Sequence, residues 1–153
     1  MEVFRLNRQR YADVLSGKGA AIKGGRWNSI GTELVYVANS RALAMAEVVV
    51  HLSIGMIMDD YMMLTIHIPD TIPMLHTLPH ELPKDWNAIP ATSETKKIGD
   101  AFVREGRACL LRVPSAVVKG DHNLLLNPFH PEFKEIKIIA AEPFPFDHRM
   151  FKP

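Results

Sequence analysis

The chain has 153 residues, of which 47% are hydrophobic and 23% are charged, values typical of a globular protein with a hydrophobic core. Its 18 Lys and Arg residues nearly balance its 17 Asp and Glu residues, so the formal net charge is only +1. This balance argues against a nucleic-acid-binding or membrane-surface protein that depends on a basic face. The length predicts one domain over residues 1–153.

The single cysteine, Cys109, excludes an internal disulfide framework and lies in an apolar run, which predicts a buried thiol. No stretch approaches the roughly 18 apolar residues that a membrane helix needs. The first residues lack the charged and apolar regions of a signal peptide, so we expect a cytoplasmic protein.

The expected elements, in chain order, do not alternate regularly between helix and strand. Residues 34–38 are rich in β-branched and aromatic side chains and predict a strand, and Ser40 is a candidate N-cap for a helix through His51. Several prolines between residues 69 and 92 indicate a long irregular connection. Residues 93–105 predict a helix ended by Gly106, and further strands are expected at residues 63–68, 108–113, 117–118 and 135–141. This order predicts an α+β fold with mixed or antiparallel sheets and flanking helices.

Residues 17–28 contain four glycines within nine positions and end in Arg26, Trp27 and Asn28. The segment is neither a Walker loop nor a dinucleotide fingerprint, because no Gly-Lys-Ser/Thr ends it and no apolar strand precedes it. One interpretation is a ligand loop in which Arg26 clamps phosphate and Trp27 offers a stacking face. The alternative is a surface loop that Trp27 anchors on the core while Arg26 remains solvated.

Glu47 lies in an apolar stretch of the expected helix, on the same face as Leu43, Ala44, Val50 and His51. A carboxylate in such a setting is costly to desolvate unless it has a partner. Two explanations remain open, an ion pair with His51 or a role in chemistry.

Ser115 follows a proline at the end of an apolar run, where a strand would leave the core and present a hydroxyl. No Gly-x-Ser-x-Gly motif surrounds it, which argues against a hydrolase nucleophile. His76 and His80 are four residues apart in a proline-broken stretch, so no metal site is expected there.

Taken together, these segments resemble the RES domain, the toxin of bacterial RES–Xre toxin–antitoxin pairs. The resemblance spans residues 4 to about 133, whereas residues 53–107 match in general character only. The matching segments are Phe4-Arg5, Gly24-Gly25-Arg26-Trp27-Asn28, Val35-Tyr36-Val37-Ala38, Ala46-Glu47-Val48-x-x-His51, Val113-Pro114-Ser115 and Asn123-Leu124-Leu125-Leu126-Asn127-Pro128.

The resemblance implies an ADP-ribosyltransferase-like fold and depletion of NAD by cleavage of the nicotinamide–ribose bond, with water or phosphate as acceptor. A protein-directed ADP-ribosyltransferase is the alternative enzyme. It further implies NAD contacts at Arg5 and Arg26, with Trp27 and Asn28 in the same loop. Tyr36 would pack on nicotinamide, Glu47 would be the catalytic carboxylate and Ser115 would complete the pocket.

The chemistry of this bond agrees with the residues present. Glycoside cleavage passes through an oxocarbenium-like transition state and normally uses two carboxylates. Nicotinamide departs from NAD as a neutral molecule, so no general acid is required and one carboxylate is sufficient. No metal is expected.

The expected partner is an Xre-type DNA-binding antitoxin that blocks the NAD pocket, with a homodimer of this chain allowed inside the complex. A non-catalytic binding module or an RNA-cleaving toxin is a further alternative, but the near-zero net charge argues against direct nucleic-acid binding.

Overall fold

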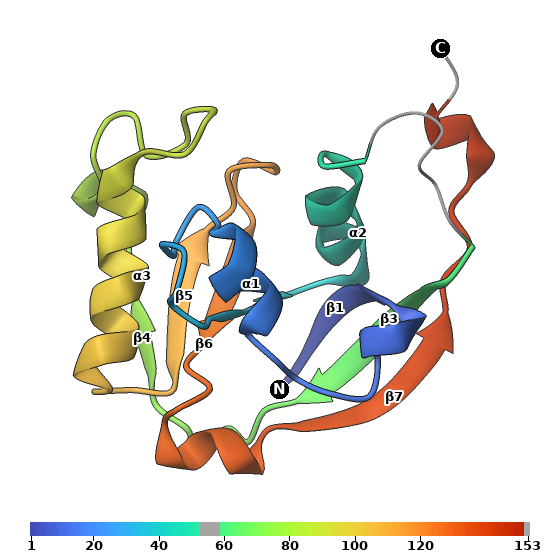
Figure 1. Ribbon diagram of the computed structural model, residues 1–153, viewed down its shortest axis with the longest axis horizontal. Coiled ribbons are helices and arrows are strands. Elements are labelled where there is room, and N and C mark those ends of the chain that lie inside the picture. Colours follow the sequence, from blue (N-terminus) through green and yellow to red (C-terminus); the bar gives the residue numbers. More distant parts are fainter. Residues whose placement is uncertain (53–58, 152–153) are drawn as a thin grey trace.

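The computed structural model describes residues 1–52 and 59–151, and in this part of the chain a mixed seven-stranded sheet is flanked by three α-helices (Figure 1). The strands are β1 (Glu2–Arg8), β2 (Val35–Ala38), β3 (Tyr61–His67), β4 (Met74–His76), β5 (Leu110–Pro114), β6 (His122–Leu126) and β7 (Lys137–Pro143). The α-helices are α1 (Lys18–Lys23), α2 (Arg41–Val49) and α3 (Ser93–Glu105). Short 3₁₀ helices span Gln9–Tyr11, Pro79–Glu81, Pro131–Glu135 and His148–Phe151.

The strand order in the sheet is β4-β5-β6-β2-β1-β3-β7. Only β4 and β5 pair in parallel, and the other neighbours are antiparallel. The expected α+β class with a mixed sheet is therefore confirmed.

The two halves of the sheet meet at a short junction between β1 and β2. Their ladder has a single register pair, Phe4 with Ala38, whereas β1 pairs with β3 along its whole length. Beyond Phe4 and Ala38 the two central strands diverge, and α2 packs against both of them. This divergence makes room for a cavity in the middle of the fold.

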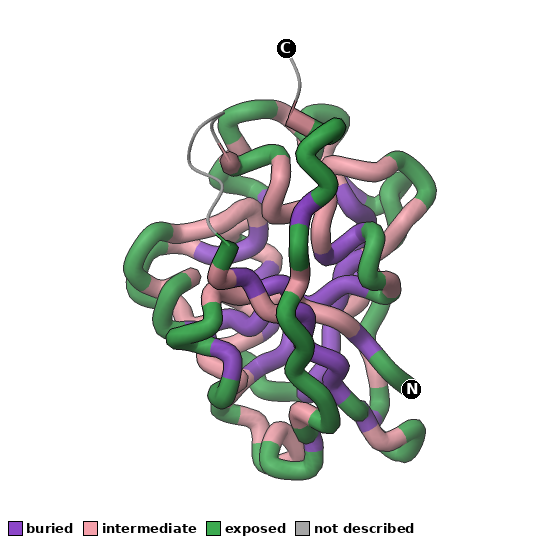
Figure 2. Tube along the Cα trace, turned by 90° about the vertical axis from the view of Figure 1, so that its right-hand side faces the viewer, coloured by how far each residue is buried: buried purple, intermediate pink, exposed green. Residues whose placement is uncertain are grey.

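Buried positions run through the middle of the molecule, whereas exposed positions gather at turns and at the outer strand β7 (Figure 2). One cluster draws its side chains from β1, β2, β3, β5 and β6 and includes Cys109, which is fully buried. Burial raises the pKa of the Cys109 thiol to about 12, so the expectation of a buried structural thiol is confirmed.

The best-predicted elements begin and end at residues with specific capping geometry. The Ser40 hydroxyl accepts a hydrogen bond from the Leu43 amide at 3.1 Å, which confirms Ser40 as the N-cap of α2. Gly106 adopts the left-handed conformation with φ 59° and ends α3, as expected. Helix α2 ends at Val49, short of His51, where three successive β-branched residues weaken the helix.

Other expectations need correction. Residues 117–118 form no strand, because the amides of Val117 and Val118 both donate to the Ser115 hydroxyl in a tight turn. The strand expected at residues 135–141 begins and ends two residues later, as β7, after a 3₁₀ turn. The glycine-rich segment contains the short helix α1, and β1, β4 and β6 lie outside the expected set of strands.

No helix among residues 1–52 and 59–151 has the length and apolar character required to cross a bilayer.

Candidate functional site

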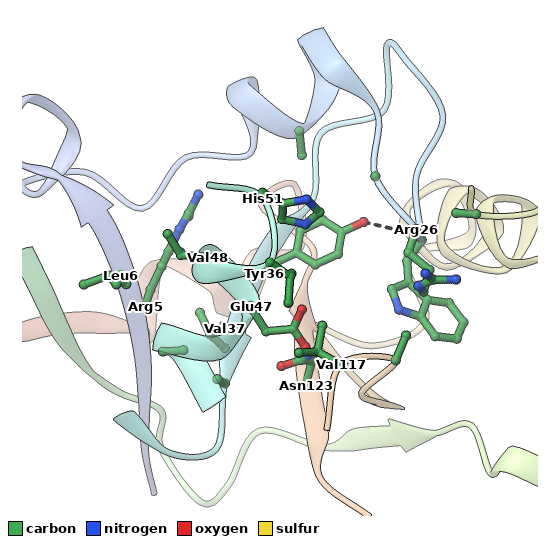
Figure 3. A pocket seen from close by; sticks show the side chains of 18 of the residues that line it. Arg5, Leu6, Arg26, Tyr36, Val37, Glu47, Val48, His51, Val117 and Asn123 are labelled. Atoms are coloured by element: carbon green, nitrogen blue, oxygen red, sulfur yellow. Dashed lines mark hydrogen bonds between the residues drawn. The ribbon is translucent and has the colours of Figure 1, made fainter. Parts of the chain in front are cut away.

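A cavity of about 850 Å³ opens where β1 and β2 diverge, a volume within the usual range for small-molecule sites (Figure 3). Strand β1 contributes Arg5 and β2 contributes Tyr36, while the loop after α1 contributes Arg26. Helix α2 contributes Glu47, and Asn123 comes from β6. Five separate segments of the chain therefore form one site.

Glu47 lies on the cavity side of α2, and one of its carboxylate oxygens is held by two donors. Oε1 accepts a hydrogen bond from Ser115 Oγ at 2.8 Å and another from Asn123 Nδ2 at 2.5 Å. Oε2 accepts no hydrogen bond from a described residue. The described residues also hold no ion pair between Glu47 and His51, although both line the cavity. Glu47 is thus fixed on one side and open on the other.

Ser115 is buried and lies behind Glu47, outside the cavity wall. Its oxygen accepts hydrogen bonds from the amides of Val117 and Val118, at 3.1 and 3.0 Å. With both acceptor positions occupied, the hydroxyl proton has one remaining direction, toward Glu47. The turn after β5 therefore orients Ser115 as a donor to the carboxylate, and Ser115 contributes to the pocket through Glu47.

Tyr36 is half-buried on β2, and its ring lines the cavity. The Tyr36 hydroxyl donates to Asn28 Oδ1 at 2.7 Å and accepts from the Trp27 amide at 3.1 Å. Burial raises the pKa of the Tyr36 hydroxyl well above its ordinary value, so it remains protonated and keeps donating. These bonds fix the ring against the glycine-rich loop.

Asn28, which was expected among the ligand contacts, is instead fully buried. Its side-chain amide donates to the carbonyl oxygens of Ala20, Ser29 and Thr32, at 2.8 to 3.1 Å. Asn28 therefore holds the loop together, and it affects the cavity by accepting the hydrogen bond of the Tyr36 hydroxyl.

Trp27 also anchors the loop, because its side chain is only 2% exposed. Its ring stacks on Trp86 at a centroid distance of 6.3 Å, within an apolar cluster that includes Phe102 of α3. Trp27 therefore anchors the loop, as the second interpretation expects, although it is also among the residues that line the cavity. Trp86 occupies one face of the Trp27 ring.

Arg26 is partly buried and forms no ion pair with a carboxylate of residues 1–52 or 59–151. Its Nη1 donates to the carbonyl oxygens of Trp86 and Ala88, at 2.8 and 3.0 Å. Burial lowers the pKa of the Arg26 guanidinium, and the negative charge of Glu47 partly offsets this effect. Arg26 thus ties the long connection before α3 to the cavity wall.

Arg5 is the more deeply desolvated cation. Its Nη1 donates to the Ser16 carbonyl oxygen at 3.2 Å, and no described carboxylate forms an ion pair with it. Burial lowers the pKa of the Arg5 guanidinium to about 10. A buried cation that lacks an anionic partner favours an anionic ligand, because such a ligand would replace the lost hydration.

Several cavity residues escaped the reasoning from sequence. Asn123 lies in a segment that matches the family but was given no role there, and only its contact with Glu47 reveals that role. Lys23, Lys96 and residues 89–91 also line the cavity, but no motif links them to Glu47 in the sequence. Within the described ranges, no three His, Cys, Asp or Glu side chains are grouped closely enough to hold a metal ion.

Comparison with protein families adds independent information. The model of the RES domain matches residues 2–147 of the chain. A protein named "Prs ADP-ribosylating toxin" from Sphingobium sp. (strain YBL2) is 41% identical over 143 residues, covering 92% of this chain and 89% of that protein. "Toxin Res" from Photorhabdus laumondii is 38% identical over 155 residues, covering 99% of this chain and 98% of that protein.

The fold has a counterpart among solved structures. The crystal structure of the M. tuberculosis MbcT–MbcA toxin–antitoxin complex contains a chain that matches with a TM-score of 0.73. The match covers 94% of this chain and 83% of that one, at 22% sequence identity. At this identity the similarity establishes a common fold.

Proposed function

The chain belongs to the RES domain family, and from this premise we propose that it is a toxin that cleaves the nicotinamide–ribose bond of NAD. The family and the names of its relatives support a toxin of a toxin–antitoxin pair that acts on NAD. The cavity supports the specific reaction. Its residues supply one carboxylate, an aromatic face and two arginines, which are the groups that this substrate needs.

The observation that carries the proposal is the Glu47 carboxylate, of which Oε1 accepts two hydrogen bonds and Oε2 accepts none from a described residue. Ser115 and Asn123 immobilise Oε1, so the carboxylate of this lining residue is held in place and need not reorganise during the reaction. A preorganised charge stabilises a developing opposite charge far more than a mobile, hydrated one does. Glu47 therefore fits the role of stabilising a ribosyl cation, with Oε2 near the 2′-hydroxyl of the same ribose.

The binding groups lie around this carboxylate. In Figure 3, Arg5 and Arg26 lie on opposite sides of Tyr36 and Glu47. The Arg26 guanidinium would bind a phosphate of the pyrophosphate, and the Arg5 guanidinium, which lacks a carboxylate partner among the described residues, would bind the nicotinamide ribose on the other side of Glu47. The Tyr36 ring would contact the flat, positively charged nicotinamide through a cation–π interaction.

The bond change needs no general acid. The C1′–N1 bond breaks with its electron pair going to the pyridinium nitrogen, and nicotinamide leaves as a neutral molecule. The acceptor oxygen, from water or phosphate, then bonds to C1′ and its proton is released to solvent. Glu47 stabilises the positive charge between these two events.

A Glu47→Gln variant tests this proposal. The amide keeps the size of the side chain but removes its charge, so the rate of nicotinamide release should fall by about 10²–10³-fold while NAD still binds. Release would be measured chromatographically with purified protein. A variant that cleaves NAD at the wild-type rate would refute the mechanism.

A protein acceptor is the second candidate, supported by the name of the 41% identical relative, "Prs ADP-ribosylating toxin". The same ribosyl cation would then be captured by a protein side chain in place of water. Incubation with NAD labelled in its adenylate half distinguishes the two outcomes, since transfer labels a protein band and hydrolysis yields free ADP-ribose.

A toxin of this kind requires inhibition in its own host. We therefore include in the proposal an Xre-type antitoxin that covers the mouth of the cavity. The solved toxin–antitoxin complex with the same fold supports the existence of such a partner.

A further inference from the structure

The cavity contains more positive charge than NAD requires. Four basic side chains line it, Arg5, Lys23, Arg26 and Lys96, whereas Glu47 is the sole carboxylate among the described lining residues. NAD brings two negative charges on its pyrophosphate and one positive charge on its nicotinamide ring. The surplus indicates a substrate with a further anionic group.

Most of this surplus positive charge lies on the Arg26 side of the cavity, opposite Arg5. Lys23 is the last residue of α1, three positions before Arg26, and Lys96 lies in the first turn of α3. The ion pairs of the described residues include neither lysine, whereas the neighbouring Lys97 pairs with Glu94 at 2.7 Å. Both lysines therefore remain available to a ligand.

The same end also has an apolar surface. Arg26 holds the connection before α3 through the carbonyl oxygens of Trp86 and Ala88. The next residues, Ile89 and Pro90, line the cavity, and Ile89 is 93% exposed. Cations beside an exposed apolar surface match the chemistry of a nucleotide, which has anionic phosphates and a flat apolar base.

We propose that the cavity also accepts NADP, and that Lys23 and Lys96 bind the 2′-phosphate of its adenosine ribose. In Rossmann folds, sites selective for NAD place an acidic side chain at that 2′-hydroxyl, whereas sites for NADP place a cation there, and the same charge complementarity applies in this different fold. Here the only described lining carboxylate is Glu47, which the proposed reaction uses at the other ribose. No described lining residue would repel a 2′-phosphate, and two lysines would attract it.

This inference rests on the proposed function and uses the same bond change. The C1′–N1 bond of the nicotinamide riboside breaks, and neutral nicotinamide leaves with the electron pair. Water adds its oxygen to C1′ and releases one proton. The products are nicotinamide and ADP-ribose 2′-phosphate.

The experiment compares nicotinamide release from NAD and from NADP by the purified full chain. We expect both to be cleaved, with kcat/KM values within about tenfold of each other. Cleavage of NAD without cleavage of NADP would overturn this inference and leave the proposed function standing. Cleavage of neither would overturn the proposed function, and the inference with it.

Lysine variants test the assignment of the 2′-phosphate. Replacing Lys96 or Lys23 with Met removes a charge-assisted hydrogen bond, so kcat/KM for NADP should fall by roughly tenfold per lysine. The value for NAD should fall less than threefold, because it has no group at that position. Lys97→Met is the matched control and should leave both values unchanged. Equal losses for NAD and NADP in the Lys96 variant would refute the assignment, and thermal melting would confirm that each variant is folded.

Discussion

At the scale of single residues, the site depends on how the chain restricts Glu47. A glutamate on a helix has three rotatable bonds, and a free side chain would point its charge in many directions. Two donors on Oε1, from Ser115 and Asn123, remove this freedom. The site thus contains one reactive carboxylate supported by two neutral residues.

Ser115→Ala should reduce kcat for nicotinamide release by roughly tenfold, in the range typical for loss of a supporting partner. KM should change little, because Ser115 lies outside the cavity wall. Steady-state kinetics would measure both values. Ser93→Ala, at an exposed position on α3, is the control. An unchanged kcat in Ser115→Ala would show that Asn123 alone positions the carboxylate.

Gly25→Ala tests the bond between Tyr36 and Asn28. A Cβ at position 25 would lie 2.7 Å from both the Tyr36 hydroxyl and Asn28 Oδ1, too close for either to stay in place. The free energy of unfolding, measured by urea denaturation, should fall by about 1–3 kcal/mol, and KM for NAD should rise.

Gly19→Ala is the matched control, since a Cβ there meets no atom within 4 Å. It lies inside α1, where alanine is favoured over glycine by about 1 kcal/mol. We expect Gly19→Ala to be neutral or stabilising. Equal behaviour of the two variants would mean that Tyr36 is not held by this bond.

The identities of the site residues were more predictable than their geometry. Resemblance to the RES domain singled out Arg5, Tyr36 and Glu47, and all three line the cavity. The sequence could not show that Asn28 is fully buried, because its three carbonyl partners depend on how the loop folds back. Asn123 escaped for the same reason, since its partner is 76 residues away.

At the scale of elements, the sequence predicted the features that depend on residues close together in the chain. The Ser40 cap, the Gly106 terminator and the β-branched run of β2 depend on neighbours within a few residues, and the structure contains all three. Strand β1 was missed because polar residues, Glu2, Arg5, Asn7 and Arg8, make up more than half of this inner strand. Arg5 and Asn7 belong there because the strand borders a cavity, which is a property of the tertiary structure.

Helix α3 positions the Arg26 end of the cavity through a close contact at Gly99. A Cβ at position 99 would lie 1.7 Å from the Trp27 carbonyl oxygen, so no larger residue fits without displacing the backbone. Gly99→Ala should therefore lower the free energy of unfolding by about 3 kcal/mol.

The consequence for the site distinguishes this variant from general destabilisation. Displacement of Trp27 moves the adjacent Arg26, so KM for NAD should rise even at temperatures where the variant is folded. Lys97→Ala, at an exposed position of the same helix, should change stability by less than about 1 kcal/mol. Wild-type stability in Gly99→Ala would show that α3 and the loop adjust freely.

At the scale of the whole molecule, the cavity is bordered by both halves of the sheet, which also share α2 and a buried core cluster. The two halves of the sheet share one register pair between β1 and β2, and residues 89–91 join the cavity through the Arg26 hydrogen bonds. A ligand that contacts both Arg5 and the Arg26 end would connect the two halves. Binding should therefore stabilise the entire fold.

The inactive Glu47→Gln variant allows this stabilisation to be measured without turnover. At NAD concentrations 100-fold above Kd, binding to the folded state adds about 2.7 kcal/mol to the free energy of unfolding. For a chain of this length the Tm should rise by roughly 5–10 °C in a thermal-shift experiment. Adding Arg5→Met to the Glu47→Gln variant removes the Arg5 cation, which lacks a carboxylate partner among the described residues. This double variant should lose most of the rise in Tm that NAD causes. If NAD shifted the Tm of both variants equally, the dinucleotide would bind without Arg5, and the two ends of the cavity would not act as one site.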